Sequence, residues 1–116
     1  MPHVILELSN NIEKQNHTQL LTEIHQNLTE MLPTQLESCK SRVIRHEEFL
    51  VGDGNINNAF VHLNIEVLSG RTQATLDLVA KKLMTLLQNN FKSLLNIHFS
   101  VSIKDLPAVY YKASSI

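Results

Sequence analysis

The chain repeats one order of predicted secondary structure, and this repeat restricts its fold more than any other feature. Apolar residues recur at helical spacing from Leu20 to Leu32 and again after Thr72, which predicts two helices. Runs that are rich in β-branched residues or that alternate predict four strands, at 3–8, 41–51, 59–68 and 97–103. Each half therefore has the order strand, polar break, helix, strand, and the two breaks (7–11 and 66–70) are alike.

Two β-α-β units in succession predict an α+β fold of order β-α-β-β-α-β, as a single domain over residues 1–116. We expect a four-stranded sheet with both helices on one face. Both side-chain sets of the first strand include aliphatic residues, so we also expect apolar side chains on the opposite face. One layer of helices cannot cover two apolar faces, which predicts a homo-oligomer whose subunits cover each other's open face.

Composition excludes several classes of partner. The formal net charge of −1 provides no strong basic field for nucleic acid or an acidic membrane surface. No apolar run approaches the roughly 18 residues that span a bilayer, and no signal peptide is visible. The only cysteine, Cys39, cannot form an intrachain disulfide. These features predict a cytoplasmic protein.

Side chains with metal-binding or nucleophilic chemistry are scattered. The six histidines form no pair at metal-binding spacing, so we expect no metal site. No glycine-rich phosphate loop or serine elbow occurs, and we expect no cofactor. Cys39 lacks a neighbouring histidine or elbow and is interpreted as a structural thiol. His62 lies in an alternating strand, which favours a packing or hydrogen-bonding role.

Pro2 is the remaining candidate for catalysis. Removal of Met1 would expose its secondary amine directly before an apolar strand, which would hold the nitrogen rigidly at the edge of the core. Burial and nearby cations both disfavour the ammonium form, so they would lower the pKa of this amine towards neutral pH. Such an amine can act as a general base.

Four stretches of the chain carry a family pattern. The first residues follow P-H-x-x-x-E-x-S-x-N-I from Pro2 to Ile12. Ser-Arg-Val follows at 41–43, Ala-Phe-Val-His at 59–62 and Ser-Gly-Arg-Thr at 69–72. Together, from Pro2 to about Lys112, they resemble the 5-carboxymethyl-2-hydroxymuconate isomerase family of the tautomerase superfamily.

The resemblance implies a tautomerase-like subunit that assembles as a trimer and needs no cofactor. It implies enol–keto tautomerisation of an unsaturated 2-hydroxy polycarboxylate, such as 5-carboxymethyl-2-hydroxymuconate, in homoprotocatechuate degradation. Pro2 matches the base, and Arg42 and Arg71 match arginines that hold substrate carboxylates. Lys40 stands where the family has an arginine; it keeps the charge but loses the planar fork. We include Lys40 among the expected carboxylate contacts.

Other interpretations remain open. The superfamily also contains dehalogenases that hydrate an unsaturated acid, and decarboxylases; in these reactions a protonated Pro2 would act as an acid. A non-enzymatic oligomer that binds a metabolite is a further alternative. Taken without the resemblance, Arg42 and Arg71 would be assigned to salt bridges on the surface or at a subunit interface.

Overall fold

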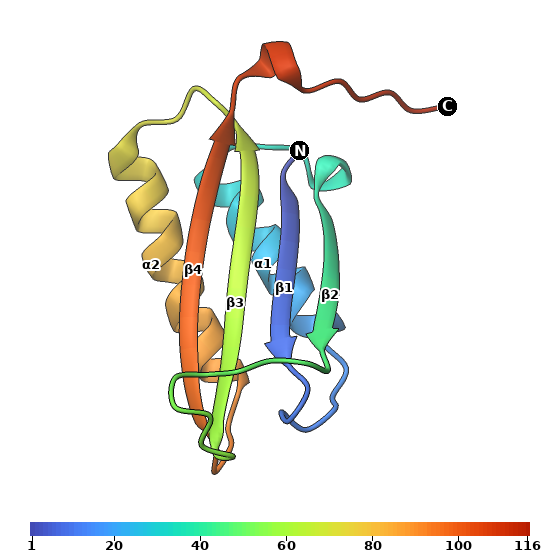
Figure 1. Ribbon diagram of the computed structural model, residues 1–116. Coiled ribbons are helices and arrows are strands. Elements are labelled where there is room, and N and C mark those ends of the chain that lie inside the picture. Colours follow the sequence, from blue (N-terminus) through green and yellow to red (C-terminus); the bar gives the residue numbers. More distant parts are fainter.

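The computed structural model describes residues 1–116, and its elements follow the predicted order (Figure 1). The long elements are β1 (His3–Ser9), α1 (Thr18–Met31), β2 (Lys40–His46), β3 (Asn58–Leu68), α2 (Gln73–Asn90) and β4 (Asn96–Leu106). Short 3-10 helices lie at Leu36–Ser38 and Ala108–Tyr110. The Thr72 hydroxyl accepts a hydrogen bond from the Thr75 N–H at 3.1 Å, so Thr72 caps α2 as predicted. Neither helix is long and apolar enough to cross a membrane.

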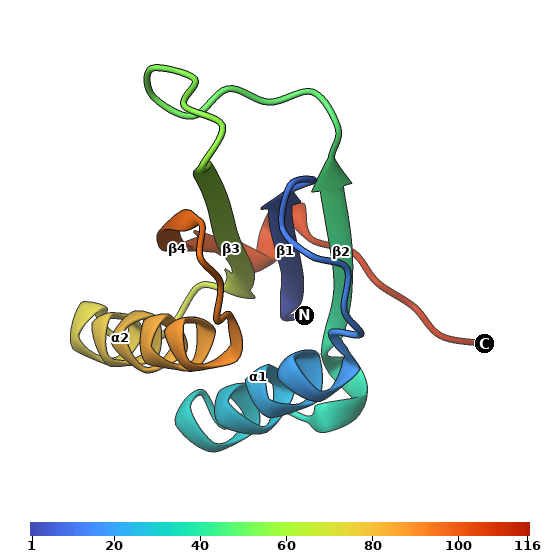
Figure 2. The same ribbon diagram turned by 90° about the horizontal axis from the view of Figure 1, so that it is seen from below.

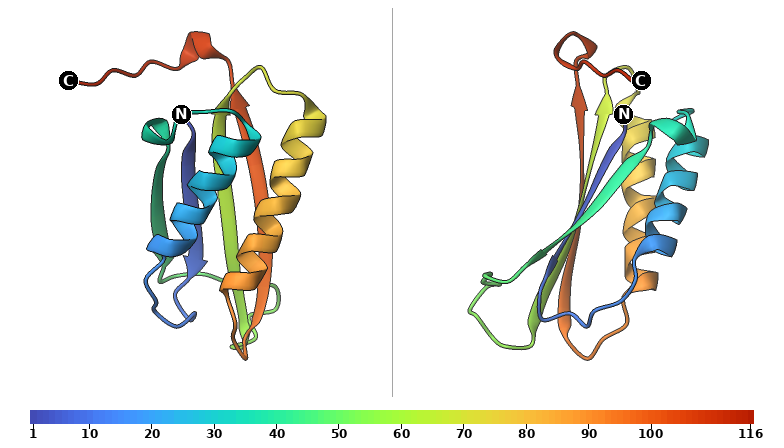
Figure 3. Two further views of the ribbon diagram at one scale, coloured as in Figure 1. Left: turned by 180° about the vertical axis from the view of Figure 1, so that it is seen from behind. Right: turned by 90° about the vertical axis from the view of Figure 1, so that its right-hand side faces the viewer.

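The four strands form one sheet in the order β2-β1-β3-β4. β1 is parallel to β2, β3 is parallel to β4, and the two pairs meet where β1 runs antiparallel to β3. Parallel neighbours require a crossover connection, which α1 supplies in the first half and α2 in the second. Both helices lie on the same face of the sheet (Figures 2 and 3), which confirms the predicted pair of β-α-β units.

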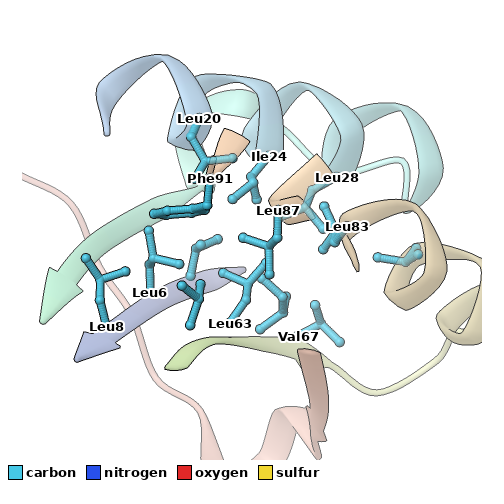
Figure 4. Close-up of a cluster of buried hydrophobic side chains, with 14 of the residues drawn as sticks. Leu6, Leu8, Leu20, Ile24, Leu28, Leu63, Val67, Leu83, Leu87 and Phe91 are labelled. Carbon is cyan, nitrogen blue, oxygen red and sulfur yellow. The ribbon is translucent and has the colours of Figure 1, made fainter. Parts of the chain in front are cut away.

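The core lies between this face and the helices (Figure 4). Alternate residues of the central strands point into it and are completely buried, as are the apolar stripes of both helices. Burying one such aliphatic side chain stabilises the fold by roughly 1.5–3 kcal/mol. The fully buried members include Val4, Leu6, Leu8, Val61, Leu63, Ile65, Ile24, Leu28, Val79, Leu83 and Leu87.

The opposite face of the sheet carries apolar side chains, as expected, but they are few and lie among polar ones. Side chains alternate strictly along a strand, and all of Val4, Leu6 and Leu8 point to the helices. Ile5 is the sole aliphatic residue that β1 places on the open face, between His3 and Glu7. The neighbouring strands add polar side chains with some apolar ones; they include Arg42, Ile44, His46, Phe60, His62, Asn64, Ser100 and Ser102.

The structure also corrects three predicted boundaries. β2 ends at His46 rather than at residue 51, because its pairing partner β1 ends at Ser9. β4 continues to Leu106, because β3 remains paired with it as far as Leu68. The helical spacing of apolar residues after Thr72 also includes Leu94 and so predicts a longer second helix, but α2 ends at Asn90 and Leu94 is fully exposed.

Candidate active site

The amino ends of β1 and β2 lie side by side at one end of the sheet, which we call the proline end. The carboxyl ends of β3 and β4, the end of α1 and the start of α2 lie at the same end (Figures 1 and 3). Pro2 is buried there, and its carbonyl accepts a hydrogen bond from the Lys40 N–H at 3.1 Å. Parallel pairing therefore places the first residue of β2 beside the head of β1, because His3 and Lys40 are register partners.

The chain's amine lies close to the cation Lys40 at the proline end. This amine belongs to Met1, one residue ahead of the Pro2 nitrogen. Burial lowers the pKa of the amine, and the charge of Lys40 lowers it further, against a smaller opposing effect from Cys39. Lys40 is exposed, and its Nζ donates a hydrogen bond to the Ser38 carbonyl at 3.2 Å. Lys40 forms no ion pair, so its charge is available to an anion.

His3 connects Arg42 to the C-terminal tail. Arg42 Nη1 lies 3.2 Å from His3 Nδ1, and His3 Nε2 lies 2.9 Å from the Tyr111 hydroxyl. Burial lowers the pKa of His3, followed by the charge of Arg42, while Glu66 opposes them. A neutral His3 can accept the Arg42 N–H at Nδ1 and donate its own N–H to Tyr111. The guanidinium of Arg42 is thereby drawn towards His3, the first residue of β1.

Tyr111 was not among the residues predicted for this site. It belongs to the tail after β4, and no periodicity or motif relates it to the first strand. His3 was noted only as part of the opening pattern. Its alternation with Val4 places it on the open face, but its hydrogen bond to Tyr111 depends on where the tail runs.

Arg71 is held apart from this group by backbone contacts. Its Nη1 donates to the Leu68 carbonyl at 3.0 Å, and its Nη2 donates to the Leu32 carbonyl at 3.1 Å. Leu32 is the C-cap of α1, so Arg71 joins the end of α1 to the loop between β3 and α2. Arg71 forms no ion pair and no hydrogen bond with Pro2, Lys40 or Arg42. Neither Arg42 nor Arg71 forms a salt bridge within the chain, and their assignment to a subunit interface stays a prediction.

Pro2 lines none of the three main clefts of the chain. One of these, of about 470 Å³, lies at the other end of the sheet, between the loop after β1 and the segment before β4. The ion pairs of the chain, His46–Glu7 and Lys81–Asp77, also lie away from Pro2. The proline end is thus an open surface that carries unpaired cationic groups.

The sequence matches the 5-carboxymethyl-2-hydroxymuconate isomerase family over residues 2–116. The chain belongs to this family. Membership supports an isomerase or tautomerase role. No curated protein matches the sequence.

Several solved structures share the family's fold. A 5-carboxymethyl-2-hydroxymuconate isomerase from Deinococcus radiodurans R1 is 20% identical, with a TM-score of 0.89 over 99% of this chain and 90% of that chain. A macrophage migration inhibitory factor-like protein from Entamoeba histolytica is 17% identical, with a TM-score of 0.71 over 97% and 95%. A fused 4-OT protein, described as a symmetric trimer, is 15% identical, with a TM-score of 0.71 over 90% and 85%. These similarities confirm the tautomerase-like β-α-β-β-α-β fold.

Two residues outside the predicted site have surroundings that agree with their predicted roles. The Cys39 thiol is buried, lies 3.7 Å from the Gln35 carbonyl and has its pKa raised by burial. It is therefore a thiol rather than a reactive thiolate. His62 lies on the open face of β3, and its Nδ1 is 2.6 Å from the Ser100 hydroxyl, which is a hydrogen-bonding role.

Proposed function

We propose that this chain catalyses cofactor-free enol–keto tautomerisation of an unsaturated 2-hydroxy polycarboxylate. 5-Carboxymethyl-2-hydroxymuconate, in the breakdown of homoprotocatechuate, is the proposed substrate. One observation carries the proposal: in a chain of this family, Pro2 is buried at the head of β1 beside Lys40, and Arg42 contacts the next residue, His3. A general base and charged groups for substrate carboxylates are then close together.

Pro2 acts as the base and then as the acid once Met1 has been removed. Its free ring nitrogen takes the proton from the enol oxygen, and the C=O bond forms as the electron pair moves along the conjugated chain. The proline ammonium returns the proton to a distant carbon, which gives the keto isomer. Burial and Lys40 lower the pKa of the amine one residue ahead of Pro2. The same surroundings favour a neutral proline amine near pH 7.

The cationic side chains bind the substrate carboxylates. Lys40 supplies a compact charge without an ion-pair partner, and Arg42 supplies a planar donor oriented by His3. Arg71 uses one N–H at each of Nη1 and Nη2 for backbone carbonyls, which leaves further N–H groups free. Since Arg71 is not hydrogen-bonded to this group, we assign it to a substrate's far carboxylate or to the site of a neighbouring subunit.

A trimer would complete this site. Pro2 lines none of the three main clefts within one chain, whereas positioned proton transfer works best where water is excluded. The fused 4-OT structure that shares this fold is described as a symmetric trimer. We propose a homotrimer in which a neighbouring subunit covers the proline end.

The proposal is tested by the conversion of 5-carboxymethyl-2-hydroxymuconate from enol to keto form. Pro2→Ala in the processed protein is expected to lower kcat by about 10²–10⁴-fold, the usual contribution of positioned acid–base catalysis. Protein that retains Met1, verified by intact mass, is expected to be equally impaired, because its proline nitrogen is acylated. Full activity in either form would refute the proline mechanism.

A pH profile separates this reaction from hydration or decarboxylation on the same fold. A proline base is active in its neutral form, so kcat/KM should rise with pH through the pKa of the amine. A proline that acts as an acid is active in its protonated form, so kcat/KM would instead fall as the pH rises through the same pKa.

A further inference from the structure

The loop between β2 and β3, residues 47–57, carries apolar side chains that the fold leaves uncovered. Leu50 is 78% exposed and Ile56 is 87% exposed, and together with Phe49 and Val51 they line a groove of about 320 Å³. The loop projects from the sheet on the side away from the helices (Figures 2 and 3). A single exposed apolar side chain is ordinary, but several on one projecting loop favour a surface for a partner.

Contacts within the loop and with β3 fix its shape. The Val51 carbonyl accepts hydrogen bonds from the Gly54 N–H at 3.0 Å and from the Asn58 side chain at 3.3 Å. Phe49 packs edge-to-face on Phe60 of β3, with ring centroids 6.4 Å apart. A loop that is ordered before binding loses little conformational entropy when a partner covers it.

The loop is also acidic. Glu47, Glu48 and Asp53 are exposed, and none of them forms an ion pair. The loop contains no lysine or arginine. Two copies of this loop that met face to face would bring like charges together, which disfavours a loop-to-loop dimer.

The proline end offers a complementary surface. Its exposed apolar side chains are Leu36, Val109 and Tyr110. Lys104 at the end of β4 and Lys112, next to the Tyr111 that contacts His3, are exposed and form no ion pair. On the strands and the tail, cationic side chains at this end outnumber acidic ones; they are Lys40, Arg42, Lys104 and Lys112 against Glu66 and Asp105.

We infer that the loop of residues 47–57 in each subunit seats on the proline end of the next copy of this chain. Leu50 and Ile56 cover the exposed apolar side chains there, and the carboxylates of the loop pair with Lys104 and Lys112. A contact between two unlike surfaces repeats around a closed ring, as a trimer requires. The inference rests on the proposed homotrimer and names the segment of the neighbour that covers the proposed site.

Carbodiimide cross-linking tests this contact without any substrate, because the reagent joins only carboxylates and amines that touch. The expected product links Glu47 or Glu48 to Lys104 or Lys112. The link can form only between chains, since β3 has 11 residues and separates the loop from the proline end by about 33 Å. Absence of this link, links to the lysines of α2 instead, or a protein that sediments as a monomer would overturn the inference.

Substitution of the exposed apolar side chains gives a second measurement. Leu50→Asp and Ile56→Asp leave the core intact, and each should raise the dissociation constant of the assembly at least about tenfold, as loss of a central interface residue does. Sedimentation over a series of protein concentrations measures this constant. Leu94→Asp makes the same change at a fully exposed leucine outside the loop and should assemble as the parent does. Unchanged constants for both loop variants contradict the contact.

Exchange of the charges tests the pairing itself. Glu47→Lys with Glu48→Lys should weaken the assembly, as should Lys104→Glu with Lys112→Glu. A chain with all four changes keeps the net charge of the parent and should recover its assembly. If the four changes together do not recover it, the carboxylates and the lysines do not meet, and the inference is wrong.

These measurements follow assembly, so their failure is distinct from failure of the proposed activity. Intact assembly of Leu50→Asp refutes the contact and leaves the proline mechanism standing. Full activity of Pro2→Ala refutes the mechanism and leaves the contact standing.

Discussion

The two ends of the sheet both carry positive charge without an acidic partner, but they hold it differently. At the proline end, Lys40 and Arg42 are exposed on an open surface. At the opposite end of the sheet, both ring nitrogens of His17 and Nη1 of Arg45 are buried without a hydrogen-bond partner. The contrast teaches that polar and cationic groups are buried at one end of the sheet, whereas at the proline end they remain on the surface, where the proposed substrate would meet them.

The sharpest separation of the two ends comes from lysine substitutions. Lys40→Ala should reduce kcat/KM roughly 10–100-fold, because a charged hydrogen bond to a carboxylate contributes about 1.5–3 kcal/mol. Lys40→Arg should retain most activity, since it keeps the charge and restores the planar guanidinium that the family has at this position. Lys92→Ala removes an equivalent charge at the opposite end of the sheet and should leave kcat/KM unchanged. A similar loss in both alanine variants would mean that net charge, rather than position, sets the rate.

Arg71 tests whether a proposed substrate contact also stabilises the fold. Arg71→Ala should lower the free energy of unfolding by about 1–3 kcal/mol, because it leaves the Leu32 and Leu68 carbonyls without their donor. Urea unfolding measures this change. Lys81→Ala removes an exposed pair with Asp77 and should leave the free energy of unfolding almost unchanged. An Arg71→Ala protein that is fully stable would contradict the backbone contacts described above.

The burial of His17 should also make the stability of the fold depend on pH. The pKa of His17 is lowered from 6.5, so the unfolded chain binds a proton at a higher pH than the folded one. The free energy of unfolding is therefore highest above pH 6.5 and falls as the pH decreases below it. His3 and His25, whose pKa values are also lowered by burial, act in the same direction.

His17→Phe should flatten that decline by up to one proton, about 1.4 kcal/mol per pH unit. Chemical denaturation at a series of pH values measures the slope. Identical slopes in the parent and the variant would show that His17 does not titrate differently on folding.

Tyr111 gives the smallest expected effect. Tyr111→Phe removes one hydrogen bond to His3 and loosens the orientation of Arg42, so kcat/KM should fall about two- to tenfold. Tyr110→Phe makes the same change at an exposed neighbour whose hydroxyl has no partner, and it should have no effect. Equal kcat/KM values for the two variants would show that the C-terminal tail does not contribute to the site.

The periodicity of apolar side chains was sufficient to predict the architecture but not to predict where each strand ends. Alternation in β3 and helical spacing in α1 and α2 lead to two β-α-β units, because a side-chain period of two or 3.6 reflects burial directly. The end of β2 could not be derived from its own residues. Residues 47–51 are as strand-like as 41–46, and the strand stops because β1 offers no further partner.

The sequence by itself determined the order of elements, the layer of helices and the family pattern that directs attention to Pro2, Lys40, Arg42 and Arg71. Only the tertiary structure decided which of these lie together. Parallel pairing puts Lys40 beside the head of β1, and His3 draws Arg42 there. Arg71 is instead bound to backbone carbonyls, and Tyr111, His17 and Arg45 acquire their meaning from residues far along the chain. Local patterns encode burial, whereas hydrogen-bond partners across loops depend on where the whole chain folds.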